Sequence, residues 1–243
     1  MMKAFIITMS DNAESLRLTK VCKESILTTD SVLDVQHFEA IQPPQLYKHN
    51  LEIFDGEFVR WSFPEEDTAN HLDFATGLFL KAYQTADIKR VMACALSHMK
   101  LWKWAVDNNE TIVVLEHDAF FERTFDPQDL TWDQAWGVVG LNDPRGNTRK
   151  GQLFHNIASA QEGIQTVPEI DNSQEPPLPM GIAGNSAYII RPWAAKELLN
   201  STKVLGLWPN DAIMCKQLFP WLRVVYPYYS TTQRNVSSTT QVA

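Results

Sequence analysis

Two kinds of hydrophobic pattern alternate along the chain. Consecutive apolar residues at 4–9 and 111–115 have the length and β-branched content of strands buried on both faces. A further strand is expected at 32–38. Between these strands, apolar residues recur every three or four positions over 18–26 and 88–106, the spacing of one helix face. This order predicts the α/β class, with a mostly parallel central sheet flanked by helices.

Further elements are expected in the second half of the chain. Pro192 fits the first turn of a helix, and Asn210 can cap the start of another. The expected elements are strands at 135–141, 186–191 and 222–226, and helices at 192–199 and 211–219.

Composition favours a single domain that contains one long loop. Residues 142–180 are rich in Gly, Pro, Asn and Gln, so they are expected to form a long mobile loop. Ser and Thr are frequent over 230–243, which is expected to be a C-terminal tail. Residues 1–229 are therefore predicted to form one domain.

Charge, the length of apolar runs and cysteine content disfavour some classes of protein. A formal net charge of -8 provides no overall basic field for a phosphate backbone, so general nucleic-acid binding is disfavoured. The longest apolar runs fall short of the roughly 20 residues of a membrane-spanning helix, so no transmembrane segment is expected. Three widely spaced cysteines, and a start without a signal-peptide pattern, favour a cytoplasmic protein with reduced thiols.

The most informative chemical feature is an acidic pair at the end of a predicted strand. Glu116 and Asp118 follow the apolar run at 111–115, so both carboxylates leave the sheet together. Hard oxygen ligands suit Mn²⁺ or Mg²⁺, which can neutralise a departing diphosphate. The alternative is a pair of acids in a solvated turn. His117, between them, is interpreted as a metal ligand, a donor-contact group or a turn residue.

Several motifs resemble those of glycosyltransferase family 25. Cys94-Ala95-Leu96-Ser97-His98 is similar to that family's Gly/Ala-Cys-x-Leu-Ser-His helix, and Glu116-His117-Asp118 to its Glu-Asp-Asp strand end. The segments at 184–188, 209–211 and 233–238 resemble its Gly-x-x-Ala-Tyr strand, its Pro-x-Asp segment and its C-terminal Gln-x-x-x-Ser stretch. The resemblance therefore runs along the whole chain in order.

This resemblance implies a glycosyltransferase-A-type, Rossmann-like fold that binds a nucleotide sugar. It implies transfer of a hexose, with galactose or glucose as candidates, from a nucleoside-diphosphate sugar of the UDP type to a glycan or other hydroxyl acceptor. Inversion at the sugar carbon and a part in lipopolysaccharide or other glycan biosynthesis are also implied. Two departures affect the site: His117 replaces the family's middle acid, and Thr8-Met9-Ser10 lacks the usual acid at the end of the first strand.

Residue roles follow from the resemblance as hypotheses. Glu116 and Asp118 are the expected metal ligands. Asp211 is expected to be the general base for the acceptor hydroxyl or a further metal-site acid, with a helix-terminal charge as the structural alternative. Residues expected to contact the donor are Thr8, Ser10, Arg17, Arg90, Ser97, His98, His117 and Asn185. Structural hydrogen bonding is the alternative for Ser97 and His98, and solvated surface charge is the alternative for the arginines.

Two other functions compete with a transferase at this stage. A metal-dependent phosphohydrolase would need more convergent acids than the sequence makes obvious. A degenerate transferase fold would act as a non-catalytic sugar-binding or assembly module. Among the aromatic residues, Trp102 is expected in the core because of its helical spacing, and Trp208, near Asp211, is expected to form a platform for the acceptor sugar.

Overall fold

The computed structural model describes residues 1–65, 71–133, 135–145, 150–170 and 179–233. The strands of its main sheet are β1 (Met2–Thr8), β2 (Leu33–Glu39), β5 (Ile112–Glu116), β7 (Val138–Gly140), β8 (Gly163–Thr166), β9 (Ala187–Ile190) and β10 (Leu222–Tyr226). Small two-stranded sheets are formed by β3 (His71–Leu72) with β4 (Phe79–Leu80), and by β6 (Ala119–Phe121) with β11 (Ser230–Thr232). The helices are α1 (Ala13–Thr28), α2 (Leu46–Ile53), α3 (Ile88–Asn108), α4 (Gly151–Ala158), α5 (Pro192–Leu205) and α6 (Asn210–Ile213), with short 3₁₀ turns at Pro43–Gln45 and Pro127–Asp129.

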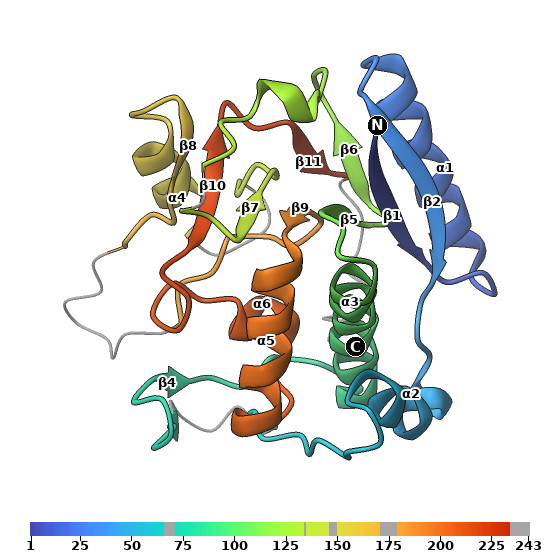
Figure 1. The fold of residues 1–243 in the computed structure, drawn as a ribbon, viewed down its shortest axis with the longest axis vertical. Coiled ribbons are helices and arrows are strands. Elements are labelled where there is room, and N and C mark those ends of the chain that lie inside the picture. Colours follow the sequence, from blue (N-terminus) through green and yellow to red (C-terminus); the bar gives the residue numbers. More distant parts are fainter. Residues whose placement is uncertain (66–70, 134, 146–149, 171–178, 234–243) are drawn as a thin grey trace.

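The main sheet has the strand order β2-β1-β5-β9-β7-β10-β8 (Figure 1). β1 pairs in parallel with both β2 and β5, and β7 pairs in parallel with β10. β9 is antiparallel to its neighbours β5 and β7, and β8 is antiparallel to β10 at the edge. Five of the seven strands in this sheet therefore point the same way, which confirms the expected α/β fold with a mostly parallel sheet.

Helices and loops bury both faces of the sheet. Ile112 and Val114 belong to the core that the sheet builds with α2, α3, α5 and α6. Val113 and Leu115 belong to a second core, which includes Cys22 of α1 and residues of β6. This separation arises because successive side chains of a strand point to opposite faces. In Figure 1, α3 and α5 lie side by side over the first of these faces.

Several boundaries differ from those expected. α6 ends at Ile213 rather than continuing to 219, because Met214 leaves the helical conformation and Cys215 forms a bridge with Gly181. Within 142–180, the segment expected as a loop, α4 and β8 form because α4 buries Phe154 and β8 pairs with β10. The start of the expected tail contributes β11, which pairs with β6.

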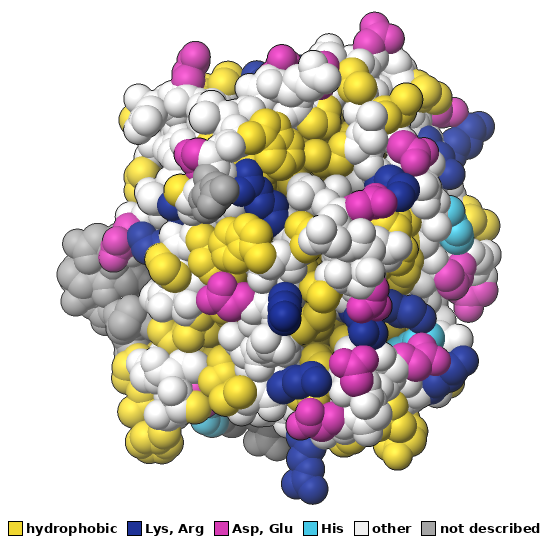
Figure 2. Space-filling model, viewed as in Figure 1, with side chains coloured by type: hydrophobic (Ala, Val, Ile, Leu, Met, Phe, Trp, Pro, Cys, Tyr) yellow, Lys and Arg dark blue, Asp and Glu magenta, His cyan; other side chains and the backbone are white. Residues whose placement is uncertain are grey.

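The surface carries both signs of charge. On the face shown in Figure 2, Lys and Arg side chains lie among Asp and Glu side chains and apolar groups. In the part of the chain that the structure describes, none of the helices combines the length and the apolar character needed to cross a membrane.

Candidate active site

β1 and β5 end beside each other at the carboxyl edge of the main sheet. Ile7 of β1 is in register with Glu116, the last residue of β5. The chain passes from β1 to β2 on one side and later reaches β5 on the other, so this edge is a topological switch point, where α/β proteins usually bind ligands. Val114 faces α3 and Leu115 faces α1, and the alternation therefore directs the side chain of Glu116 toward α3.

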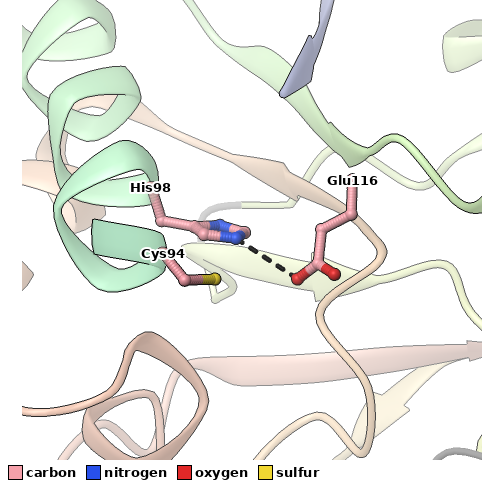
Figure 3. A group of neighbouring side chains, drawn as sticks. All are labelled: Cys94, His98 and Glu116. Carbon is pink, nitrogen blue, oxygen red and sulfur yellow. Dashed lines mark ion pairs between the residues drawn. The ribbon is translucent and has the colours of Figure 1, made fainter. Parts of the chain in front are cut away.

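α3 presents His98 to this carboxylate. His98 Nε2 lies 3.3 Å from Glu116 Oε1 (Figure 3). The other ring nitrogen, Nδ1, lies 2.9 Å from the hydroxyl oxygen of Tyr188, which also accepts a hydrogen bond from Trp102 Nε1 at 2.8 Å. One distribution of protons satisfies every group: the Tyr188 hydroxyl donates to Nδ1 of a neutral His98, and Nε2–H donates to Glu116. This buried chain of hydrogen bonds orients the Glu116 carboxylate.

The acidic pair combines partial burial with mutual repulsion. Burial by itself raises the pKa of Glu116, but the hydrogen bond and charge of His98 leave it below its ordinary value. Burial and the charge of Glu116 raise the pKa of Asp118 to about 7. Asp118 Oδ1 is buried and has no hydrogen-bond partner among the described residues. The side chain of Glu116 is 34% exposed, so an ion can reach the pair from solvent.

Asp211 approaches the same group from the start of α6. Its carboxylate interacts electrostatically with Glu116 and His98, and it forms a hydrogen bond with Tyr83. Burial raises the pKa of Asp211; the Tyr83 hydrogen bond opposes this, and the charge of Glu116 adds to it. The residue nevertheless keeps solvent-exposed surface. A carboxylate with a raised pKa and an accessible oxygen is suited to accept a proton from an alcohol.

His117 ties the acidic turn to α1. Its Nδ1 lies 3.0 Å from Ser15 Oγ, and that hydroxyl accepts a hydrogen bond from the Met9 amide at 2.9 Å. Burial lowers the pKa of His117, against the charges of Glu116 and Glu14. The imidazole therefore has a structural partner at Nδ1, in keeping with the turn-residue alternative.

Gln233 holds the same turn from the C-terminal side. Its backbone amide donates to the carbonyl oxygen of Asp118 at 2.7 Å. Its side-chain Nε2 donates to the carbonyl of Leu18 at 3.0 Å and lies 3.3 Å from that of Ala119. Its position was signalled in the sequence only by the resemblance of 233–238 to the family's C-terminal stretch.

Two of the side chains predicted to contact the donor form hydrogen bonds within the protein. Thr8 Oγ1 shares a buried hydrogen bond of 2.8 Å with Thr19 Oγ1. Ser97 Oγ donates to the carbonyl of Ala93 at 2.8 Å and accepts from the amide of Ile41 at 2.9 Å. Both hydroxyls therefore link secondary-structure elements, which favours the structural alternative for Ser97.

Three further predicted donor contacts lie on the surface. Ser10 hydrogen bonds to the carboxylate at the end of β2. Arg17 forms an exposed ion pair with Glu14 at 2.6 Å, and Arg90 forms one with Asp87 at 3.7 Å. Exposed pairs of this kind usually contribute little to stability.

Asn185 precedes the residue whose backbone pairs with Glu116. It is buried, and its Nδ2 has no hydrogen-bond partner among the described residues. The following residue, Ser186, accepts a hydrogen bond from the amide of Glu116 at 2.8 Å. The structure brings together Glu116, Asp118, His98 and Asp211.

The expectation for Trp208 is wrong, whereas that for Trp102 is confirmed. Both are fully buried, and the indole nitrogen of Trp208 donates to Ser62 Oγ at 2.9 Å. Trp208 packs edge-on against Phe63 and is unavailable to stack on a sugar. The sequence did not single out Tyr83 or Cys94 as site residues; Tyr83 follows β4, in a stretch where no periodic pattern marks it.

A comparison with protein families identifies the chain. The model of glycosyltransferase family 25 (LPS biosynthesis protein) matches residues 1–131, more than half of the 243 residues. The chain belongs to glycosyltransferase family 25. The resemblance stated from the sequence is therefore confirmed, and the protein is a glycosyltransferase. The expected Rossmann-like fold of the glycosyltransferase-A type agrees with the sheet order described above.

Solved glycosyltransferase structures resemble this family 25 member. Mouse xyloside xylosyltransferase 1, apo form, matches with a TM-score of 0.47 and 9% identity, over 91% of this chain and 83% of that chain. Galactosyltransferase LgtC in complex with donor and acceptor sugar analogs matches with a TM-score of 0.45 and 11% identity, over 96% of this chain and 87% of that chain. A comparison with curated proteins finds no sequence match.

Proposed function

We propose that this glycosyltransferase transfers a hexose, galactose or glucose, from a UDP-type nucleoside-diphosphate sugar to a hydroxyl group of a glycan. The reaction is proposed to require Mn²⁺ or Mg²⁺ and to invert the configuration of the sugar carbon. The observation that supports this most is the carboxylate pair at the switch point, in which Asp118 Oδ1 is buried beside the charge of Glu116 and has no partner in the part of the chain that the structure describes.

The residues present fit a hard divalent cation. Glu116 and Asp118 provide carboxylate oxygens, the ligand type that Mn²⁺ and Mg²⁺ prefer. Burial and the neighbouring Glu116 raise the pKa of Asp118, whose Oδ1 has no partner among the described residues. A bound cation would stabilise the ionised Asp118, because it would offset both the desolvation of this carboxylate and its repulsion by Glu116. When bound, the ion would offset the negative charge that develops on the departing diphosphate.

Asp211 is proposed as the general base. The acceptor hydroxyl oxygen attacks the anomeric carbon, its proton passes to the Asp211 carboxylate, and the bond from the anomeric carbon to the diphosphate oxygen breaks. The nucleoside diphosphate leaves with the electron pair of that bond. His98 does not take this proton; it holds Glu116 through the hydrogen-bond chain to Tyr188.

Donor binding tests the metal-dependent part of the proposal. Calorimetric titration with a panel of nucleotide sugars, first with Mn²⁺ and then with a chelator, should reveal one donor whose binding needs the metal. Asp118→Asn should abolish that binding, whereas the exposed control Asp34→Asn should retain it. Donor binding that is equal with Mn²⁺ and with chelator would contradict metal dependence. A donor that is bound but never consumed would indicate a binding module instead.

Turnover tests the role of Asp211. Asp211→Asn should retain metal-dependent donor binding and lower kcat by about 10²-fold or more, the range for removal of a general base. Magnetic resonance of the product should show the anomeric configuration opposite to that of the donor. An unchanged kcat would remove Asp211 from the base role, and a product with retained configuration would refute inversion.

A further inference from the structure

Three different ligand types surround one point next to the proposed Mn²⁺ or Mg²⁺ site. Cys94 and His98 are four residues apart on α3, so they share one face of the helix, and Glu116 faces them from β5 (Figure 3). Cys94 Sγ, a ring nitrogen of His98 and a carboxylate oxygen of Glu116 lie within 4.8 Å of one another.

A tetrahedral zinc site would bring these three atoms closer together. Zinc bond lengths to sulfur, imidazole nitrogen and carboxylate oxygen place such ligand atoms about 3.4 to 3.6 Å apart. The 3.3 Å between His98 Nε2 and Glu116 Oε1 is just below this range. Only Cys94 Sγ needs to move inward, and its present hydrogen bond to Asn210 Oδ1 is long, at 3.8 Å.

The imidazole has a hydrogen-bond partner at Nδ1, the ring position that usually orients a metal-bound histidine. A histidine that binds a metal through Nε2 is oriented by a hydrogen bond at Nδ1. Here Nδ1 contacts the Tyr188 hydroxyl at 2.9 Å, and Trp102 holds that hydroxyl at 2.8 Å. His98 is 1% exposed, so this orientation is fixed by packing as well.

The electrostatic field at the cluster favours a cation. The carboxylates of Glu116, Asp211 and Asp118 all act electrostatically on Cys94. Three carboxylates around one point attract a divalent ion. Sulfur and nitrogen ligands select zinc-class ions over Mg²⁺ or Mn²⁺.

We propose that Cys94 Sγ, His98 Nε2 and Glu116 form a binding site for Zn²⁺ with an open fourth position. The three ligand atoms come from α3 and β5, and a water molecule can occupy the remaining position. Zinc binding engages Glu116 and thereby withdraws it from the Mn²⁺ or Mg²⁺ site. This competition, but not the zinc site itself, rests on the proposed function.

The exchange of protons balances. The Cys94 thiol releases its proton to solvent when sulfur binds zinc, and Glu116 binds as the carboxylate. The imidazole stays neutral: Nε2 loses its proton to solvent and binds zinc, while Nδ1 takes up a proton from solvent and uses it to hydrogen bond to the hydroxyl oxygen of Tyr188. That oxygen has two lone pairs, so it accepts from both Nδ1 and the Trp102 indole, and the Tyr188 O–H, which no longer donates to Nδ1, turns away from the ring.

Cobalt spectroscopy tests the site without reference to activity. Co²⁺ added to the chelator-treated full chain should give one tight site with thiolate-to-cobalt charge-transfer absorption, which Zn²⁺ abolishes. Cys94→Ser should remove that absorption and weaken Zn²⁺ binding by at least about tenfold in a competition with a chromophoric chelator. Cys215→Ser, which changes a buried cysteine outside the cluster, should leave both unchanged. Absence of the absorption in the native chain, or its persistence in Cys94→Ser, would overturn the proposal.

Competition with manganese tests the consequence for the neighbouring site. Zn²⁺ should release bound Mn²⁺ from the native chain, seen as growth of the paramagnetic resonance signal of the free ion, and should need a higher concentration to do so in Cys94→Ser. If Mn²⁺ never binds, the metal-dependent function fails while the cobalt result still stands. If Mn²⁺ binds and zinc releases it equally well from both proteins, the competition through Cys94 is refuted.

Discussion

Asp118→Asn should make the metal-free protein more stable while removing its metal-dependent function. Burial and the charge of Glu116 raise the pKa of Asp118 from an ordinary 3.8 to about 7 in the folded protein. The folded state therefore binds a proton more tightly than the unfolded chain at this position. The stability of the native protein is highest below the unfolded pKa and falls as pH rises through the window from 3.8 to about 7.

The difference between the two pKa values of Asp118 gives the size of the change in stability. Each step of one in pKa corresponds to about 1.4 kcal/mol, so the ionised Asp118 costs on the order of 4 kcal/mol above the folded pKa. At about pH 5 the cost is less than about 2 kcal/mol, because the folded carboxyl is then mostly protonated. Asn has nearly the same shape and no charge, so Asp118→Asn should be more stable by up to these amounts.

Urea unfolding in the presence of a chelator measures the difference. The midpoint for Asp118→Asn should exceed that of the native chain, with a larger gap at about pH 8 than at about pH 5 and with equal slopes. The exposed control Asp34→Asn should shift the unfolding free energy by less than about 0.5 kcal/mol. A variant that is no more stable than the native chain at the higher pH, or a gap independent of pH, would refute the reasoning.

Manganese should narrow the difference in stability between the two proteins. An ion that binds only the folded state adds about 2.7 kcal/mol at a hundredfold excess over Kd. The native chain should gain this stabilisation, and Asp118→Asn should gain almost none because half of the carboxylate pair is missing. Equal stabilisation of both proteins by Mn²⁺ would place the ion elsewhere.

Three structural substitutions have separate expected outcomes. Ser97→Ala should cost about 1 to 3 kcal/mol in urea unfolding, because it leaves the buried amide of Ile41 without its acceptor; an unchanged midpoint would contradict this. Tyr188→Phe should cost a similar amount and also weaken Zn²⁺ binding by about tenfold or more in chelator competition, whereas loss of stability alone would indicate a purely structural hydroxyl. Gly206→Ala should lower the free energy of unfolding by more than about 1 kcal/mol, seen as a lower thermal midpoint, since φ is 94° and a Cβ would lie 2.3 Å from Ser62 Oγ. A stabilised variant would show that the turn can relax.

The sequence by itself determined the local elements and the acidic strand end. The apolar run before Glu116 and the helical spacing around Trp102 depend on which side chains follow one another, so they could be recognised without the fold. The family motifs at 94–98 and 116–118 carried the identity as a glycosyltransferase, which the family match confirms.

Tertiary structure decided which distant groups share the site. β9 enters the sheet antiparallel between β5 and β7, and this pairing places Tyr188 against His98, 90 residues away in the sequence. Asp211 reaches Glu116 only because the chain returns through α6. Burial likewise assigned Trp208 to the core. Such contacts depend on long-range packing, for which a linear pattern of apolar and polar residues contains no distance information.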